Sequence, residues 1–356
     1  MSSLFSPLQV GALTLPNRVL MAPLTRCRAE GANVPTDLMA EYYAQRASAG
    51  LLIAEATMVT EHNSAFYAEP GIYNAAQVAG WKLVTDAVHA KGGRIYLQLW
   101  HGGRACHPAF NNGGTTVAPS AVAIRGFEVH TPNGKVAHVV PRELRDDELP
   151  GIVAGFLAAA QNAHVAGFDG VEVHGANGYL LEQFIRPTSN QRTDSYGGSI
   201  ENRARFVIEA AKAAIAAIGA DKVGIRLSPY GVYNDMPDYP DMASDYAYLA
   251  AKLNELGLVY IHLVDHSSMG APEVSASIKQ TIRKEFKRSL ILSGGYDAAR
   301  AEKELEDKAC DLVAVGRPFL SNPDLVARWK SGAAVNEIDF GTFYTPGPKG
   351  FTDYPK

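Results

Sequence analysis

The 356-residue sequence lacks several features that define large classes of protein. It has no apolar run of about eighteen residues, so it predicts no membrane-spanning helix. The first residues carry neither a basic segment nor an apolar core, so we expect no secretion signal. The three cysteines, Cys27, Cys106 and Cys310, are too few and too widely spaced for a disulfide framework or a zinc pattern. These absences predict a cytoplasmic protein.

The composition is that of a folded, near-neutral chain. Apolar residues make up 47% and charged residues 20%, which favours a large buried core over disorder. The net charge of −4 argues against a nucleic-acid-binding surface. The length alone suggests about two domains, but α/β barrels often reach it as one. No linker divides the chain, so we expect a single domain over residues 1–356.

Short apolar runs recur along the chain and predict eight β-strands. Most are continuous rather than alternating, as is typical of parallel strands covered on their outer face. The expected strands are residues 18–23, 50–57, 94–100, 170–174, 223–228, 259–264, 290–294 and 312–316.

The segments between these runs carry helical patterns. The expected helices are residues 36–49, 75–91, 146–166, 199–219, 241–257, 273–287, 297–307 and 322–332. Strand and helix thus alternate eight times, which is the pattern of a (β/α)₈ TIM barrel, an α/β fold.

Three regions lie outside this alternation. Residues 1–16 predict a hairpin with a two-residue turn that closes the lower end of the barrel. Residues 101–145 form a long insertion after the third strand, with a second hairpin expected around Pro132, Asn133 and Gly134 and a place over the mouth of the active site. Residues 333–356 predict a coil tail.

The most informative stretch is residues 174–179, which directly follow the fourth expected strand. Its glycines allow a sharp turn, so that His174, Asn177 and Tyr179 leave one strand end together. Two such groups can hydrogen-bond a substrate oxygen and the third can give up a proton. This equipment would polarise a carbonyl or nitro group and protonate a neighbouring carbon. The alternative is a connecting loop with incidental polar residues.

The ends of the last two expected strands are suited to a phosphate. Gly294 and Gly295 follow the seventh strand, and Gly316 and Arg317 follow the eighth. Glycines let backbone N–H groups approach an anion, and arginine can bind it with two hydrogen bonds. Barrels often bind phosphate with these two loops. The alternative is a tight turn with a surface arginine.

Other strand residues leave two interpretations open. Arg226 lies inside an apolar strand and needs a partner, which can be Glu172 in an ion pair or an electron-rich ligand. Gln98 and Thr25 can hydrogen-bond the edge of a flat heterocycle, or they can be polar residues satisfied within the core.

Several common sites are not predicted. His101 and His107 lie six residues apart without a paired acid, so we expect no metal site. The sequence has no Gly-x-Ser-x-Gly nucleophile motif and no Rossmann fingerprint after a strand. A nicotinamide cofactor would therefore bind without that fingerprint.

Taken together, these strand-end residues resemble the Old Yellow Enzyme family of FMN-dependent ene-reductases. The resemblance extends from Leu4 to Tyr354. Within this family, the sequence as a whole most resembles the bacterial nitrate-ester and N-ethylmaleimide reductases. Its most specific segments are residues 17–19, 21–26, 98–104, 174–179, 183–184, 190–194, 196–199 and 316–325.

The resemblance implies a set of FMN-binding residues. It implies that Thr25 contacts the O4 and N5 edge of the flavin, together with the backbone of Pro23, Leu24 and Ala56. Gln98 and Arg226 would bind the pyrimidine end of the flavin. Gly294, Gly295, Gly316 and Arg317 would hold its phosphate.

The resemblance also implies a reaction. NADPH, with NADH as the alternative, would reduce FMN and leave, and an α,β-unsaturated aldehyde, ketone, imide or nitroalkene would then accept hydride from flavin N5. His174 and Asn177 would bind the activating oxygen and Tyr179 would donate the proton. Tyr344, with Phe66 and Tyr67, would line the substrate pocket. We expect no partner beyond such small molecules and a monomer or homodimer.

Two positions depart from subgroups of this family. The nitrate-ester and N-ethylmaleimide reductases commonly carry a second histidine where this chain has Asn177, while fungal and plant members commonly carry asparagine. Thr25 occupies a position that is cysteine in the thermophilic-like subgroup, and Cys27 lies two residues on, so we assign Cys27 no flavin role.

A different class of function uses the same residues. A flavin-free barrel, either a phosphosugar lyase or isomerase or a phosphate-binding module, would keep the phosphate loops and use His174 and Tyr179 for acid–base chemistry. The strand ends offer this alternative no evident catalytic lysine or pair of acids.

Overall fold

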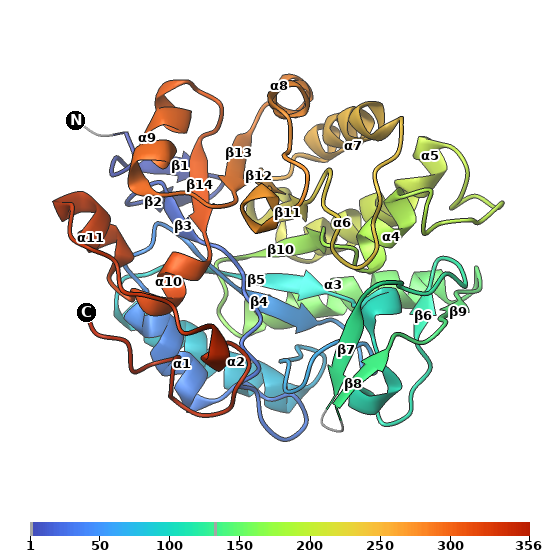
Figure 1. Ribbon diagram of the computed structural model, residues 1–356, viewed down its shortest axis with the longest axis horizontal. Helices are drawn as coiled ribbons and strands as arrows, with labels where there is room; N and C mark the ends of the chain where they lie inside the picture. The colour runs from blue at the N-terminus through green and yellow to red at the C-terminus, as the bar shows by residue number, and fades with distance from the viewer. Residues whose placement is uncertain (1–2, 132–133) are drawn as a thin grey trace.

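The computed structural model describes residues 3–131 and 134–356 and contains a closed barrel of eight parallel strands (Figure 1). All eight predicted strands are confirmed, with ends that differ by a few residues. They are β3 (Val19–Met21), β4 (Leu52–Met58), β5 (Ile95–Trp100), β10 (Gly170–Gly175), β11 (Val223–Leu227), β12 (Tyr260–Val264), β13 (Ser289–Ser293) and β14 (Leu312–Val315). They follow one another around the barrel in chain order, and β14 pairs with β3 to close it.

The strand register brings the polar residues of the predicted site together. His174 on β10 pairs with Arg226 on β11, and Glu172 on β10 pairs with Gln98 on β5. Strands β4 and β5 shift register between Ala54 and Ala56, the position expected to contact a flavin. Because parallel strands end at the same edge, these side chains share the carboxyl end of the barrel.

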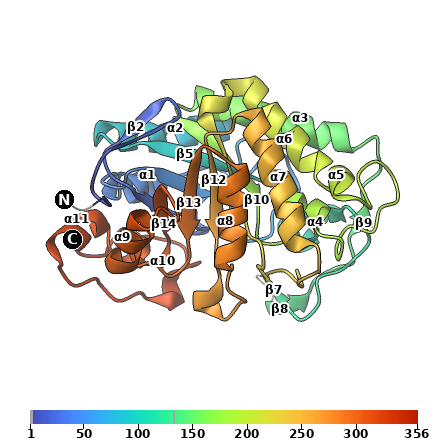
Figure 2. The ribbon, with the colours of Figure 1, turned by 90° about the horizontal axis from the view of Figure 1, so that it is seen from above.

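Helices cover the outside of the barrel, as Figure 2 shows for α3, α6, α7 and α8. The predicted helices correspond to α1 (Asp37–Gln45), α2 (Ala75–Ala90), α3 (Leu149–Val165), α5 (Ile200–Arg203), α6 (Arg205–Ile218), α7 (Met242–Leu256), α8 (Ala276–Glu285), α9 (Ala298–Glu306) and α11 (Leu325–Ser331). Two short helices, α4 (Leu180–Ile185) and α10 (Arg317–Ser321), were not predicted.

The prediction of one helix over residues 199–219 was wrong in one respect, because the helix is divided at Ala204 into α5 and α6. Arg203, the last residue of α5, is buried and its Nη2 donates to Asp245 Oδ2 on α7 at 2.7 Å. A buried arginine needs such a partner, and the boundary between the two helices directly follows this residue.

The predicted N-terminal hairpin is confirmed. Strands β1 (Leu8–Val10) and β2 (Leu13–Leu15) are antiparallel and join through Gly11, whose φ is +55°. Val10 and Leu15 pack with Tyr96 and Tyr260 in an apolar cluster that closes the end of the barrel opposite the site.

The insertion after β5 contains two short pairs of strands. Strands β6 (Val117–Ala118) and β9 (Arg142–Glu143) are parallel, and β7 (Glu128–Thr131) and β8 (Gly134–Ala137) form the second predicted hairpin. Pro132 and Asn133, expected at its turn, lie outside the described residues. The two hairpins, β1–β2 and β7–β8, lie far apart in both ribbon views.

The remaining short elements are single 3₁₀ turns. They are η1 (Gly103–Ala105), η2 (Pro108–Phe110), η3 (Ala220–Lys222), η4 (Ser267–Met269) and η5 (Phe340–Thr342). Across the part of the chain that the structure describes, no helix is both long and apolar enough to cross a bilayer.

Candidate active site

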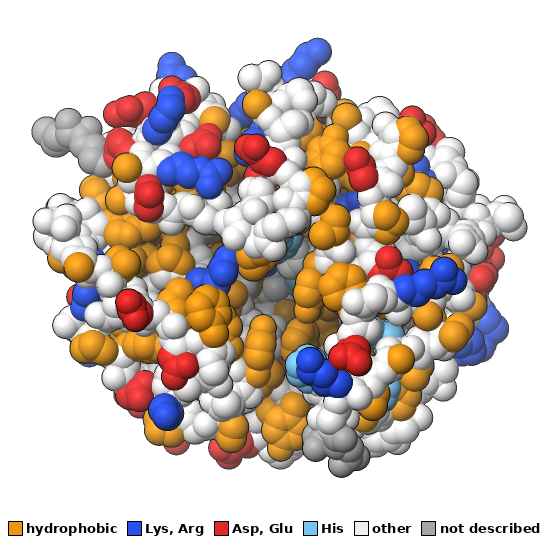
Figure 3. Space-filling model, in the orientation of Figure 1, with side chains coloured by type: hydrophobic (Ala, Val, Ile, Leu, Met, Phe, Trp, Pro, Cys, Tyr) orange, Lys and Arg blue, Asp and Glu red, His pale blue; other side chains and the backbone are white. Residues whose placement is uncertain are grey.

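A cavity of about 330 Å³ lies at the carboxyl ends of the barrel strands. Figure 3 shows the hollow near the centre of this face, with hydrophobic side chains around it. Its volume is within the range of small-molecule sites. The residues predicted for the site that line it are Pro23, Leu24, Thr25, Ala56, Phe66, Gln98, His174, Asn177, Tyr179, Arg226, Gly294, Gly295, Gly316, Arg317 and Tyr344.

Tyr67 does not belong to this set. Its side chain is 62% exposed and lines a neighbouring cavity, while the preceding Phe66 borders both cavities. The two residues lie in a bend and a turn of the chain, and of the pair only Phe66 borders the site. The prediction that both line the substrate pocket is therefore not matched by the geometry.

The turn after β10 explains how three functional groups leave one strand end. Asn177 and Gly178 both have left-handed backbones, with φ of +60° and +70°. A Cβ on Gly178 would lie 2.7 Å from the carbonyl oxygen of Tyr233, so glycine is required there. The two left-handed residues turn the chain back, and Tyr179 returns to the cavity at the start of α4.

His174 is held as a neutral hydrogen-bond donor. It is 3% exposed, and burial, aided by the charge of Arg226, keeps its pKa well below the ordinary 6.5. Its Nδ1 accepts a hydrogen bond from the backbone N–H of Ala176 at 3.3 Å. The proton of the neutral ring therefore lies on Nε2, which can donate to a ligand in the cavity.

Tyr179 is held as a protonated phenol. Its ring meets those of Trp100 and His174 edge to face, each at 5.1 Å between centroids. Burial is the main cause that raises its pKa well above 10. The group is therefore available as a proton donor throughout the neutral range.

A buried network orients Gln98. Its Nε2 donates to Glu172 Oε1 at 2.7 Å, and Glu172 Oε2 lies 2.9 Å from His262 Nδ1. His262 Nε2 lies 2.9 Å from Ser293 Oγ, which links the network to β13. Because the amide nitrogen of Gln98 is used by Glu172, its amide oxygen is left for the cavity as an acceptor.

Arg226 has no ion-pair partner within residues 3–131 and 134–356. Its Nε is buried without a hydrogen-bond partner there, and the nearby Glu172 bonds to Gln98 and His262 instead. Burial lowers the pKa of Arg226 and the nearby Glu172 raises it, but the two groups do not pair. Of the two interpretations open from the sequence, the ion pair with Glu172 is wrong. A buried donor of this kind needs a partner, which a ligand can supply.

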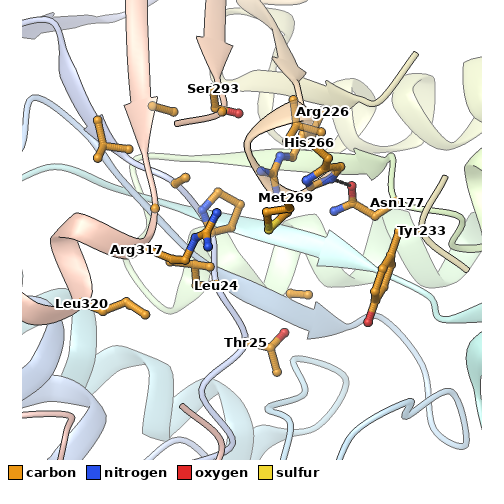
Figure 4. Close-up of a pocket in the computed structure, with 18 of the residues that line it drawn as sticks. Leu24, Thr25, Asn177, Arg226, Tyr233, His266, Met269, Ser293, Arg317 and Leu320 are labelled. Carbon is orange, nitrogen blue, oxygen red and sulfur yellow. Dashed lines mark hydrogen bonds between the residues drawn. The ribbon is translucent and has the colours of Figure 1, made fainter. Parts of the chain in front are cut away.

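The loops after β13 and β14 form an anion-binding cradle. Gly294 and Gly295 have φ of +132° and +66°, and a Cβ on Gly294 would lie 2.1 Å from the carbonyl oxygen of Asp265. In the described part of the chain, the N–H groups of Gly294, Gly295 and Gly316 have no partner. The guanidinium of Arg317 points into the cavity (Figure 4). Free N–H groups beside a guanidinium suit a phosphate.

Four aromatic residues on loops also border the cavity, and we call Phe66, Tyr233, Phe343 and Tyr344 the aromatic group. Phe66 and Tyr344 stack at 5.8 Å, and Phe343 meets Tyr344 edge to face at 6.2 Å. Tyr344 is 56% exposed. Among the residues described, the insertion supplies none to the lining; its Phe127 packs on Tyr233, and its Ala105 and Ile124 share an apolar cluster with Tyr179.

Several lining residues were missed from the sequence. The largest omission is at the end of β12, where Asp265 and His266 border the cavity. They follow a strand as His174 follows β10, so the same rule applied to the sixth strand would have found them. Tyr233 and Phe343 lie on loops, Met269 ends η4 and Leu320 lies on α10, and no local pattern marks them.

The two histidines considered for a metal have local roles instead. His101 Nδ1 accepts from the N–H of Gly103, and His107 Nδ1 accepts from the N–H of Ala109. Burial lowers the pKa of His101 to about 3. Within the described residues, no three acidic, histidine or cysteine side chains are grouped as metal ligands.

Comparison with known sequences gives a family match over most of the chain. Residues 3–336 match the model of the NADH:flavin oxidoreductase / NADH oxidase family. The chain is 44% identical over 357 residues to a protein described as a probable flavin mononucleotide-dependent alkene reductase of Leishmania infantum, covering 99% of this chain and 97% of the relative.

Comparison with solved structures agrees with this family match. Morphinone reductase in complex with tetrahydroNAD is 48% identical with a TM-score of 0.94, over 100% of this chain and 98% of that one. The Old Yellow Enzyme homologue of Zymomonas mobilis is 41% identical with a TM-score of 0.95, over 99% of each chain.

Proposed function

Because the chain belongs to the Old Yellow Enzyme family of FMN-dependent flavin oxidoreductases, we propose that it is an ene-reductase. Its substrates would be α,β-unsaturated aldehydes, ketones, imides or nitroalkenes. The proposal combines the family with the donors that face the cavity, namely His174, Asn177 and Tyr179.

The residues in the cavity fit FMN. The acceptor oxygen of Gln98 and the unpaired donors of Arg226 match a heterocycle edge in which an N–H lies between carbonyl oxygens. Arg317 and the free N–H groups after β13 and β14 match its phosphate. Thr25, with the backbone of Pro23, Leu24 and Ala56, would contact the ring from β3 and β4. The positive charge of Arg226 would stabilise negative charge on a reduced ring.

When bound, FMN would supply the hydride-transfer chemistry that links a reduced nicotinamide to the β-carbon of the alkene. His174 Nε2–H and the amide N–H of Asn177 would donate hydrogen bonds to the activating oxygen of the substrate. These bonds would withdraw electrons from the double bond and stabilise the charge that develops on that oxygen. The neutral state of His174 leaves it as a fixed donor that does not itself give up a proton.

Tyr179 would complete the reaction by giving its proton to the α-carbon. Its burial keeps the phenol protonated before the reaction. The aromatic group would line the entrance and select substrates by shape.

NADPH is the donor that we propose, with NADH as the alternative. Support for a nicotinamide in this pocket comes from the related morphinone reductase, which was solved with tetrahydroNAD. The cytoplasmic location, the single domain and the monomer or homodimer stay predictions.

One observation carries the proposal: of the three arginines that line the cavity, Arg226 and Arg317 receive neither an acid partner nor a side-chain hydrogen-bond acceptor from the described residues, whereas Arg26 is bonded to Phe343 and Gly350. This favours a ligand with an electron-rich ring and an anionic tail. Among the described residues, none of those that line the cavity is a lysine, which weakens the lyase or isomerase alternative.

The test is anaerobic turnover by the purified yellow protein. We expect NADPH or NADH to bleach the absorbance of the bound flavin at roughly 450 nm. Addition of 2-cyclohexen-1-one or a nitroalkene should restore this absorbance. A flavin that is reduced but never reoxidised by any of the four substrate classes would contradict the proposed function.

Arg317→Ala tests the phosphate cradle separately. We expect its FMN content after gel filtration to fall below that of the wild type, because one guanidinium contact to the phosphate is lost. Lys330→Ala, on the outer helix α11, is the matched control for loss of a positive charge. Full FMN occupancy in Arg317→Ala would rule out a cradle that depends on this residue.

A further inference from the structure

His266 and Asn177 form a hydrogen-bonded pair inside the cavity. His266 Nε2 lies 2.8 Å from Asn177 Oδ1, although the two residues are 89 positions apart in the chain. An amide oxygen can only accept, so the ring proton of His266 must lie on Nε2. Figure 4 shows this bond, with the amide nitrogen of Asn177 pointing away from His266 into the cavity.

The backbone of Asn177 is fixed on both sides. Its N–H donates to Ser228 Oγ at 2.7 Å, and its carbonyl oxygen accepts from Asn234 Nδ2 at 2.9 Å. These bonds hold the left-handed backbone but leave the terminal amide torsion, which is broad and nearly two-fold in asparagine. Without a further contact, the amide could present either its nitrogen or its oxygen to a ligand.

The charge state of His266 supports a fixed role. Burial, together with the positive charges of Arg226 and Arg317, lowers the pKa of His266 to about 4. The ring is therefore neutral at pH 7 and carries one proton. That proton is used in the bond to Asn177, so the pair has one defined arrangement.

We propose that His266 is a positioning residue that holds the Asn177 amide with its nitrogen toward the oxygen of the substrate. This inference rests on the proposed function. It goes beyond it by naming what sets the orientation of the second donor. If the amide turned over, its oxygen would face the substrate oxygen and repel it.

The orientation also predicts the class of ligand that this side of the cavity accepts. With His174 Nε2 and Asn177 Nδ2 both donating, these two residues offer two donors and no acceptor to the incoming group. Carbonyl, nitro and phenolate oxygens accept hydrogen bonds and satisfy such a site. An alcohol or amine that must donate a hydrogen bond does not.

Binding experiments test the role of His266. We would measure the Kd of 2-cyclohexen-1-one from its effect on the flavin absorbance of the FMN-loaded protein. His266→Leu removes the donor and should weaken binding by roughly 5- to 30-fold. His266→Gln keeps an N–H donor and should recover most of this loss. Ser267→Ala, on the same loop but outside the cavity lining, is the control for folding and FMN content.

A double-mutant cycle separates positioning from packing. In an Asn177→Ala background, His266→Leu should have no further effect on Kd, because the amide that it orients is gone. Equal effects of His266→Leu in both backgrounds would overturn the proposal. So would an unchanged Kd in the wild-type background, or equal losses in His266→Leu and His266→Gln.

A flavin-independent measurement keeps this inference distinct from the proposed function. In the cofactor-free protein, ¹⁵N NMR of the histidine rings should show His266 as the neutral Nε2–H form at pH 7. A proton on Nδ1 would overturn the pairing whatever the enzyme reduces. The FMN-loaded wild type could fail to bind or reduce enones while the Nε2–H form of His266 is observed. That result would contradict the proposed function and the role of His266 in positioning a substrate ligand, but not the hydrogen bond between His266 and Asn177.

Discussion

Two groups of residues border the cavity and are built in different ways. Gln98, His174 and Arg226, which we call the strand group, lie on β5, β10 and β11 and are nearly fully buried. The aromatic group lies on loops, and two of its members, Tyr233 and Tyr344, are among the exposed large side chains. In the strand group, Gln98 is hydrogen-bonded to Glu172 and His174 to the N–H of Ala176, whereas the side chains of the aromatic group make ring contacts.

The difference suggests a division of labour. Strands of a closed barrel cannot shift independently, so the donors and acceptors of the strand group have fixed positions, as electrostatic stabilisation of a reaction requires. Loops can vary in course without disturbing the barrel. We therefore expect changes at buried donors to affect chemistry and binding strongly. Changes in the aromatic group should affect the choice of substrate more weakly.

The largest effect is expected for Tyr179→Phe. Flavin reduction by NADPH should remain, while alkene reduction should slow by roughly 100-fold or more, because the proton donor is lost and the ring shape is kept. Stopped-flow measurement of the two half-reactions separates these steps. Equal alkene turnover in the variant would refute the role of Tyr179 as proton donor.

His174→Ala should weaken the binding of enones and phenols by roughly 10-fold, since one hydrogen bond from a buried donor is removed. The Kd is read from the flavin absorbance of protein with normal FMN content. If affinity for both ligand types is unchanged, His174 does not contact the substrate.

Tyr344→Ala tests the aromatic group. Its stacking on Phe66 is lost, so kcat/KM should fall by roughly 2- to 10-fold for bulky enones and less for 2-cyclohexen-1-one. FMN content should be normal. A loss as large as that of Tyr179→Phe for every substrate would remove the distinction between the two groups.

Glu69 provides the smallest expected effect, on stability. Its Oε2 accepts from Ser64 Oγ and from the N–H groups of Ala65 and Phe66, and so holds the loop that carries Phe66. Burial raises its pKa from the ordinary 4.5 to about 8. Folding therefore favours the protonated carboxyl, and the stability from this group is complete below pH 4.5 and lost as pH rises toward 8.

Glu69→Gln should remove this loss. We expect the Tm of the variant to decline less than that of the wild type between pH 5 and 9, with a difference on the order of 2 °C across that range. Glu55, whose pKa burial raises to about 7, is present in both proteins, and its charge is a smaller cause of the raised pKa of Glu69. Parallel curves of Tm against pH would mean that Glu69 is already ionised in the folded protein.

The same contrast explains what the sequence could predict. The eight strands were found because continuous apolar runs mark buried parallel strands, and the residues at their ends then followed from the barrel rule. His266 obeys that rule and was overlooked, so its omission was not a limit of the sequence. The roles assigned to these residues stay predictions until ligands are bound.

Other features depend on contacts between distant segments. Phe343 reaches the cavity because its carbonyl oxygen accepts from Arg26 Nε and Arg28 Nη1, more than 300 residues earlier in the chain. The helices α4 and α10 have only six and five residues, too few for a clear apolar period. Neither feature has a local signature, because tertiary packing decides it.

The central claim is that the strand group and the glycine loops together bind one FMN. Titration of cofactor-free protein with FMN, followed by flavin fluorescence and by the yellow colour kept after desalting, tests it most directly. The account predicts one tightly held FMN per chain. A folded protein that stays colourless after this titration would contradict it.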